Sequence, residues 1–268
     1  MMKARIRASA LCGLALLLAG ATSAVAERRS REALDRYLSG LHGAERGRVI
    51  PATEGSLSRL FAGDDFYVLR FSQYPVAIAP PAPLASNNIF VVKPDDAIQH
   101  FRDRNALKAF FQTALPPVKT EAEARDATEA WLRLTQEFAQ DGFLQFSTPD
   151  DGLRVESGQS GGLLATGRAV VEPRGGSSGR IVASLTFDAA GRLTNVSERT
   201  NIKRGIRPIC QATKLVDPDP IVRRMAEQDI LVMGRAAERY LDEVRRTAGP
   251  QLRQAIDRMW DQILADDR

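Results

Sequence analysis

Residues 166–202 have the sequence TGRAVVEPRGGSSGRIVASLTFDAAGRLTNVSERTNI. Three stretches rich in apolar and β-branched residues occupy 166–172, 180–187 and 192–202. The joints between them, PRGGSSG and DAAG, contain the residues that form turns most readily. Short joints of this kind connect antiparallel neighbours, so we predict three consecutive strands of an antiparallel β-meander. One buried face is expected from the apolar residues Leu185, Phe187, Leu193 and Val196.

A helix is predicted directly before the meander. Thr120 and Glu123 have the spacing of a capping box, in which the hydroxyl accepts from the amide of residue 123 and the carboxylate from the amide of residue 120. Apolar residues follow at helical spacing, at Ala124, Ala127, Trp131, Leu134 and Phe138. A helix with one apolar face beside a meander with one apolar face predicts an α+β fold, an antiparallel β-meander packed with helices.

The residues before this helix predict two more strands and two more helices. Strands are expected over 66–71 and 88–93, and the prolines at 75, 80, 81 and 83 impose extended backbone between them. A helix around 107–115 ends at a pair of prolines, and a helix over 31–41 has a stripe of leucine and tyrosine. Residues 47–58 have only a weak pattern and are expected to form a mobile joint.

The segment 211–268 is expected to be helical. Asp219 followed by Pro220 is typical of a helix start, with the aspartate as N-cap and proline in the first turn. One apolar stripe runs from Val222 to Val244, and a second runs from Leu252 to Ile263. Gly249 and Pro250 lie between the two stripes and break the helix, so the pattern predicts a C-terminal αα-hairpin.

The order of a helix followed by strands that turn through FDAAG at 187–191 resembles the cystatin-like layout of small exported bacterial domains, including PepSY-type modules. This resemblance covers residues 120–202. Over its whole length the chain also resembles uncharacterised secreted bacterial proteins. Neither resemblance implies an activity, and no catalytic residue is carried over from either.

The isoelectric point near 9.3 suggests an anionic partner, so the origin of the charge matters. The chain has 37 Lys and Arg against 33 Asp and Glu. Residues 1–26 hold Lys3, Arg5 and Arg7 and no acidic residue, so 34 basic residues face 33 acidic ones in the rest of the chain. Most of the net charge of +4 therefore lies in the first residues, and we do not expect nucleic-acid binding.

Residues 1–26 have the pattern of an export signal. Three basic residues precede an apolar stretch from Ala8 to Gly20, and Ala24-Val25-Ala26 has the small-x-small pattern of a cleavage site. We expect cleavage after Ala26 and a soluble product in the periplasm or outside the cell. No later segment has the roughly 20 apolar residues of a membrane span, so no transmembrane helix is expected in the mature chain.

We therefore expect a cleaved signal peptide at 1–26, an N-terminal helix and joint at 27–60, an α+β domain at 61–210 and a helical hairpin at 211–268. Cys210 is the one cysteine after residue 26, so no internal disulfide is expected. It is predicted to be a small buried apolar residue, and an intermolecular disulfide or a reactive thiol is the alternative.

The segment GQSGG at 158–162 matches the G-x-S-x-G pattern of a nucleophile elbow and resembles the serine segment of chymotrypsin-like proteases. An elbow needs its histidine after the serine, whereas both histidines, His42 and His100, precede it. The order His, Asp, Ser is available through His42, an aspartate at 64, 65, 95 or 96, and Ser160.

Three observations favour a plain glycine-rich loop instead. His42 follows a helical stripe, and residues 105–141 predict two helices where a double β-barrel needs strands. The pattern also recurs at 175–179, in an evident turn. Ser160, His42 and Asp65 are nevertheless kept as the candidate residues of a serine hydrolase.

No cofactor or metal site is expected. The chain has no Walker A sequence and no G-x-G-x-x-G after a strand, and its histidines and cysteines lack metal-ligand spacing. Basic residues on the C-terminal helices alternate with acidic ones, which indicates a solvated, ion-paired face. The patch from Lys203 to Pro208 is the basic cluster least explained by this pattern, and it would serve either as an interdomain turn or as a contact for an acidic partner.

These observations favour a non-enzymatic exported protein whose sheet or helical hairpin binds another protein or a component of the cell envelope. One alternative is a serine hydrolase that uses Ser160 with His42. A second alternative is a homodimeric scaffold in which the apolar stripe from Val222 to Val244 pairs between two chains.

Overall fold

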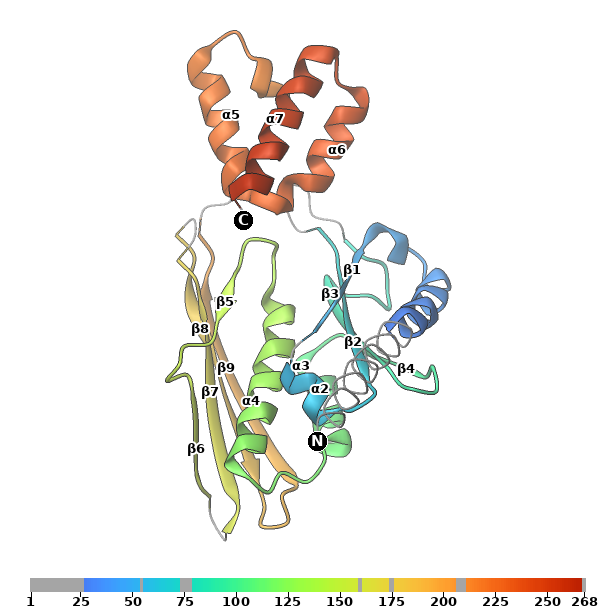
Figure 1. The fold of residues 1–268 in the computed structure, drawn as a ribbon, viewed down its shortest axis with the longest axis vertical. Coiled ribbons are helices and arrows are strands. Elements are labelled where there is room, and N and C mark those ends of the chain that lie inside the picture. Colours follow the sequence, from blue (N-terminus) through green and yellow to red (C-terminus); the bar gives the residue numbers. More distant parts are fainter. Residues whose placement is uncertain are drawn as a thin grey trace, which may run out of the picture.

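The computed structural model describes residues 27–53, 55–72, 79–158, 161–173, 176–205 and 211–266. Figure 1 shows two antiparallel sheets with helices between them and a group of three helices at one end of the molecule. The fold is therefore α+β, as predicted. The expected export signal, Ser160 and Cys210 lie outside the described residues, so what we infer about them stays a prediction.

The first sheet has the strand order β1-β2-β3-β4, and all neighbouring pairs are antiparallel. Its strands are β1 (Arg48–Pro51), β2 (Asp65–Arg70), β3 (Asn87–Val92) and β4 (Ile98–Phe101). The strands predicted around 66–71 and 88–93 are confirmed as β2 and β3. β3 is buried along its whole length because it is an inner strand with a hydrophobic core on each face.

Residues 47–58 do not form the expected mobile joint. They contain β1, which pairs with β2, and the start of α2 (Gly55–Leu60). Each element is too short to show a full period in the sequence: β1 is a brief edge strand and α2 has fewer than two turns. Leu57 and Leu60 are buried in the main core, so no break in packing falls at residue 60.

The second sheet contains the predicted meander. β7 (Leu163–Val171), β8 (Ser178–Phe187) and β9 (Leu193–Lys203) pair in chain order, and β5 (Phe146–Ser147) and β6 (Leu153–Ser157) both pair with the free edge of β7. The turn between β8 and β9 is closed by Asp188, whose carboxylate accepts from the amides of Ala190 and Arg192. Gly191 in this turn has a φ of 81°, a conformation that favours glycine.

Helices fill the space between the sheets. α4 (Glu121–Thr135) lies on the inner face of the second sheet, preceded by α3 (Arg104–Ala114) and followed by the 3-10 helix η2 (Gln136–Ala139). The predicted capping box is present: the Glu123 amide lies 3.2 Å from Thr120 Oγ1, and the Thr120 amide lies 3.0 Å from Glu123 Oε2. The start of α4 is therefore set by local sequence.

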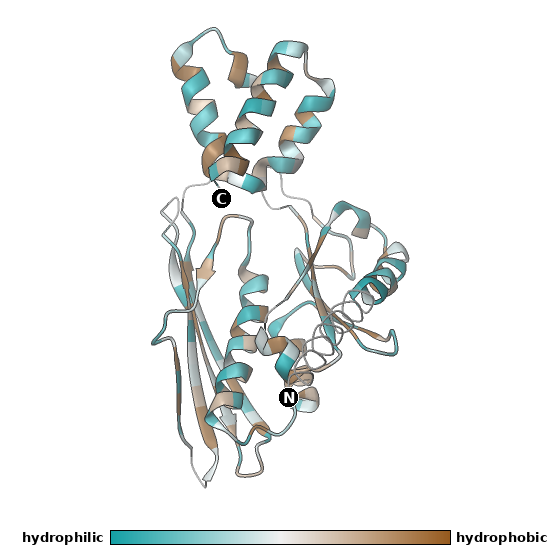
Figure 2. Ribbon diagram, in the orientation of Figure 1, coloured by the Kyte–Doolittle hydropathy of each residue, from teal (hydrophilic) through white to brown (hydrophobic). Residues whose placement is uncertain are grey.

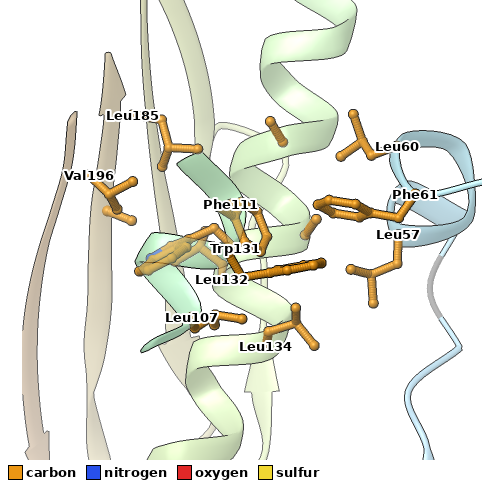
Figure 3. Close-up of a cluster of buried hydrophobic side chains, with 14 of the residues drawn as sticks. Leu57, Leu60, Phe61, Leu107, Phe111, Trp131, Leu132, Leu134, Leu185 and Val196 are labelled. Atoms are coloured by element: carbon orange, nitrogen blue, oxygen red, sulfur yellow. The ribbon is translucent and has the colours of Figure 1, made fainter. Parts of the chain in front are cut away.

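The main hydrophobic core surrounds Trp131 of α4. Its ring makes an edge-on contact with Phe111 of α3, with ring centroids 5.2 Å apart. Figure 3 shows side chains that approach this core from α2 and from the second sheet, among them Leu57, Leu60, Phe61, Leu185 and Val196. The core therefore joins the two sheets through the helices that lie between them.

A second core covers the other face of the first sheet. The helix over residues 27–39, predicted at 31–41, buries Leu34 and Leu38 against Leu69 and Phe90. The hydroxyl of Ser30 lies 2.8 Å from that of Tyr67 in β2. The N-terminal helix is thus an integral layer of the fold.

The C-terminal segment forms three helices where two were expected. They are α5 (Pro220–Met233), α6 (Glu238–Thr247) and α7 (Pro250–Asp266), with the 3-10 helices η4 (Ala212–Val216) before α5 and η5 (Gly234–Ala237) after it. Asp219 caps α5 by accepting from the amide of Ile221, as predicted. α5 ends at Gly234, whose φ of 53° is positive and whose presence divides the expected long helix in two.

The predicted apolar stripe is buried inside this three-helix bundle. Ile230, Met233 and Leu241 pack against Ile256 and Met259 of α7 in a core of their own. Figure 2 shows hydrophilic and hydrophobic residues interleaved along all three helices, as expected for helices with one buried face. The stripe that the scaffold hypothesis assigns to a second chain is thus covered by the chain's own α7.

His100 of β4 is partly buried beside β3. Its ring stacks on Phe90 with centroids 4.4 Å apart, and its Nε2 donates to Asn88 Oδ1 at 3.0 Å. The amide nitrogen of Asn88 donates to two backbone carbonyls, so its oxygen is the acceptor in this pair. Burial, helped by the charge of Arg102, lowers the pKa of His100 from 6.5 to about 4.

We expect His100 to make folding stability depend on pH. Because the unfolded chain binds the proton more tightly, the free energy of unfolding falls as pH decreases from about 6.5 to 4. Urea unfolding across this range tests the prediction. His100→Gln keeps a hydrogen-bond donor for Asn88 but has no group that titrates in this range, so the free energy of unfolding of this variant should fall less steeply with decreasing pH. An equal pH dependence of the unfolding free energy in the variant and in the unmodified protein would show that His100 is not its source.

Candidate functional site

The candidate hydrolase residues do not form a described site. His42 is exposed in the turn after the N-terminal helix, and Asp65 is the first residue of β2. Within the described ranges, no hydrogen bond joins their side chains. Asp64 is paired with Lys93, with Oδ2 and Nζ 2.5 Å apart. The involvement of Ser160 stays a prediction because that residue is not described.

A groove lies where the first sheet, α3 and the three-helix bundle meet, and we call it the junction groove. It consists of two adjoining cavities of about 660 and 550 Å³ that share Asn87 and Gln140. Cavities of this size are typical of sites for organic ligands. The larger cavity is lined by residues at the start of β3 and α3 and near η2. The smaller cavity is lined by residues of β1, β2, η5 and α6.

Three arginines line the larger cavity. Arg102 and Arg104 flank Asp103, the N-cap of α3, and Arg204 follows β9. Arg102 and Arg204 are exposed, and the Nε of Arg204 lies 3.4 Å from Asp141 Oδ2. Asp103 Oδ1 accepts from the amides of Asn105 and Ala106, so one oxygen of this carboxylate is engaged by the start of α3. This end of the groove therefore presents a converging set of guanidinium groups.

Arg104 is held in place by buried groups. Its Nε donates to Glu198 Oε1 at 2.5 Å, and the Glu198 side chain is only 7% exposed. Glu198 also accepts from Trp131 Nε1 at 2.9 Å and from Thr200 Oγ1 at 3.0 Å. The guanidinium carbon of Arg104 lies 5.7 Å from the centre of the Phe138 ring. Because Trp131 of the main core holds Glu198 in place, the Arg104 side chain is preorganised.

The smaller cavity has an apolar wall and a second anchored arginine. Ile50, Phe71 and Phe143 supply the apolar surface. Arg70 also lines this cavity, and its Nε donates to Glu137 Oε2 at 2.9 Å. Glu137 is 1% exposed and is also bound by Arg133 of α4, with Nη1 and Oε1 3.0 Å apart.

The helical bundle closes this cavity with acidic side chains. Glu238 and Asp242 of α6 line it opposite the arginines of the first sheet. Arg48 of β1 reaches across to Glu238, with Nη1 and Oε2 3.5 Å apart. Both side chains are largely exposed, so this pair contributes little stability, but it does link the bundle to the sheet.

The groove combines guanidinium, amide and aromatic groups with carboxylates, and Arg102, Arg104 and Arg204 lie in the larger cavity. Arginine forks bind carboxylate and phosphate groups through paired hydrogen bonds. The arginine-lined cavity is continuous, through Asn87 and Gln140, with the cavity that Phe71 and Phe143 line. The arrangement therefore suits an organic anion that also has an apolar part.

Only one edge of this groove was indicated by the sequence. Arg204 belongs to the unexplained basic patch at 203–208, and the structure places it in the groove lining. The arginines at 102 and 104 carried a usable signal, because they flank a helix N-cap, but nothing in the sequence shows that they lie near Arg204. Residues 206–208 of the patch are outside the described part of the chain.

The described residues show neither a metal site nor a membrane-spanning helix. No group of three or more histidine, cysteine, aspartate or glutamate side chains is placed to hold a metal ion. No helix there combines the length and the apolar character needed to cross a membrane.

The comparisons with known proteins returned no relative. No protein-family model, no curated protein and no solved structure matches this chain. The likeness to cystatin-like domains thus stays a prediction.

Proposed function

We propose that this chain is a non-enzymatic, exported binding protein, and that the junction groove holds an anionic component of the cell envelope or an anionic segment of another protein. The observation that carries the proposal is the convergence of Arg102, Arg104 and Arg204 on one cavity of about 660 Å³. Export is inferred from the sequence of residues 1–26 alone.

The anchoring of the arginines supports binding as the role of the groove. Glu198 holds Arg104, and Glu137 holds Arg70, both through carboxylates that are almost fully buried. A side chain fixed in advance loses less conformational entropy when a ligand binds. Arg102 has no carboxylate partner among the described residues and remains able to pair with a ligand. The anionic group is therefore expected at the arginine end and the apolar part near Phe71.

A fluorescent organic anion tests this proposal. The probe 8-anilinonaphthalene-1-sulfonate has a sulfonate group and an apolar ring system, and it is expected to bind the folded protein at one saturable site. The double variant R102A/R204A should weaken its binding about tenfold or more, because a hydrogen bond to a charged group contributes roughly 1.5–3 kcal/mol. Fluorescence titration measures the dissociation constants.

A matched pair of arginines supplies the control. R28A/R36A removes the same charge from the exposed face of the N-terminal helix, where the two side chains are 83% and 69% exposed. Its affinity for the probe should equal that of the unmodified protein. Equal affinities for the two double variants, or no saturable binding at all, would rule out the groove as an anion site. Cooperative thermal unfolding of each variant excludes the possibility that the probe binds to a partly unfolded state with exposed apolar surface.

A further inference from the structure

The second sheet has a face that no described helix covers. α4 packs on one side of this sheet, where Ala165, Ile181 and Ala183 are buried. Because successive residues of a strand point to opposite faces, the residues that alternate with these point away from α4. The outward positions of β6 to β9 are partly or fully exposed. We call this surface the outer face. β9 has 11 residues, so the outer face is about 36 Å long.

Basic residues gather at one end of the outer face. Arg168 of β7 is opposite Val182 of β8, which is opposite Arg199 of β9. One row further on, Arg180 is opposite Asn201, and in the row after that Lys203 is opposite Ser178. Residues two positions apart on neighbouring strands are still within reach of long side chains, so these four basic residues form one cluster across three strands.

Carboxylates offset this cluster only in part. Asp151 pairs with Arg168, with Nη2 and Oδ1 2.6 Å apart, while Glu156 lies on β6 away from the cluster and Glu172 follows β7. Within the described part of the chain, no carboxylate forms an ion pair with Arg180, Arg199 or Lys203. Like charges on neighbouring strands repel, so this end of the outer face has a positive potential that attracts an anionic partner.

Three of the four basic residues line a shallow depression of about 390 Å³. Its lining includes Arg168, Arg180 and Lys203 together with Ser178 and Asn201, whose hydroxyl and amide groups are hydrogen-bond donors. A guanidinium or ammonium group beside such donors matches the oxygens of a phosphate group. The depression is thus suited to a phosphate that projects from a larger surface.

We propose that the outer face binds the anionic phospholipid headgroups of a membrane surface through Arg168, Arg180, Arg199 and Lys203. The outward residues of β7, β8 and β9 include no aromatic side chain, the kind on which nucleic-acid bases stack and which anchors most protein interfaces. Binding to phospholipid headgroups does not require aromatic side chains, because basic residues near an anionic bilayer are attracted to it by charge alone. Lys203 directly precedes Arg204 of the junction groove, but none of the four basic residues lines the groove. Substitutions at Arg180 and Arg199 therefore leave the groove residues unchanged, and the two proposals can fail independently.

Cosedimentation with lipid vesicles tests the proposal. Vesicles of phosphatidylcholine with about one third phosphatidylglycerol should bind the protein at low salt, and vesicles of phosphatidylcholine alone should not. Binding should weaken as salt increases, because exposed charges are screened. The variant R180E/R199E reverses two exposed charges of the cluster and should lower the partition coefficient at least tenfold.

The control variant R28E/R36E makes the same change in net charge on the N-terminal helix, at the opposite side of the molecule. It should bind anionic vesicles within about twofold of the unmodified protein. The proposal is overturned if the two variants bind vesicles equally, or if the unmodified protein does not sediment with them. Tighter binding to duplex DNA than to vesicles would also overturn it. Circular dichroism checks that both variants fold.

Discussion

Glu137→Ala is expected to lower the free energy of unfolding by about 3–5 kcal/mol, the usual cost of removing one partner from a buried ion pair. Glu137 is 1% exposed and binds Arg70 of β2 and Arg133 of α4. Without its carboxylate, two arginines whose side chains are each only 29% exposed lose their counter-charge. For a protein of this size the change corresponds to a fall in melting temperature of roughly 10 °C.

Urea unfolding and thermal melts measure this effect. Glu32→Ala is the matched control, because Glu32 pairs with Arg28 on an exposed helix face and its side chain is 57% exposed. That substitution should cost less than about 0.5 kcal/mol. If Glu137→Ala and Glu32→Ala had the same stability, the buried pair would have no special role in joining the first sheet to η2.

Trp131→Ala is expected to cost about 3–5 kcal/mol, because it removes the largest buried side chain of the main core and leaves a cavity. Figure 3 shows Trp131 beside Phe111 of α3, on the side toward the second sheet. Its Nε1 also donates to Glu198, the carboxylate that holds Arg104 in the junction groove. The substitution therefore weakens both the core and the support of the groove.

Trp131→Phe separates these two contributions. Phenylalanine retains most of the apolar contact with Phe111 and loses the hydrogen bond to Glu198, so we expect a cost of about 1–2 kcal/mol. Denaturant unfolding of both variants gives the comparison. Equal losses for the alanine and phenylalanine variants would mean that the hydrogen bond, and not the packed ring, provides the stability.

Elements with strong local signals were predictable. The capping box at Thr120, the start of α5 at Asp219 and the meander of β7 to β9 all depend on residues close together in the chain. β1, β4 and β6 were missed because they are short strands with polar residues, and each is defined mainly by the partner it pairs with. Gly234 was also overlooked, although its positive φ divides the C-terminal helix.

The candidate site was far less predictable than the fold. The sequence alone drew attention to the basic patch at Lys203 and Arg204, and to Ser160 and His42, which the described structure does not join into a site. Arg70, Arg104 and Arg204 are distant in the chain and meet near one groove only because the first sheet, α3 and the bundle converge there.

From the amino-acid sequence we could derive the α+β class, most helices and strands, the near balance of charge after residue 26, and the expectation of export. These properties depend on composition or on neighbours within a few residues. The grouping of arginines in the junction groove and on the outer face depends on strand register and on the packing of the bundle. Those contacts join residues tens of positions apart, and no local pattern encodes them.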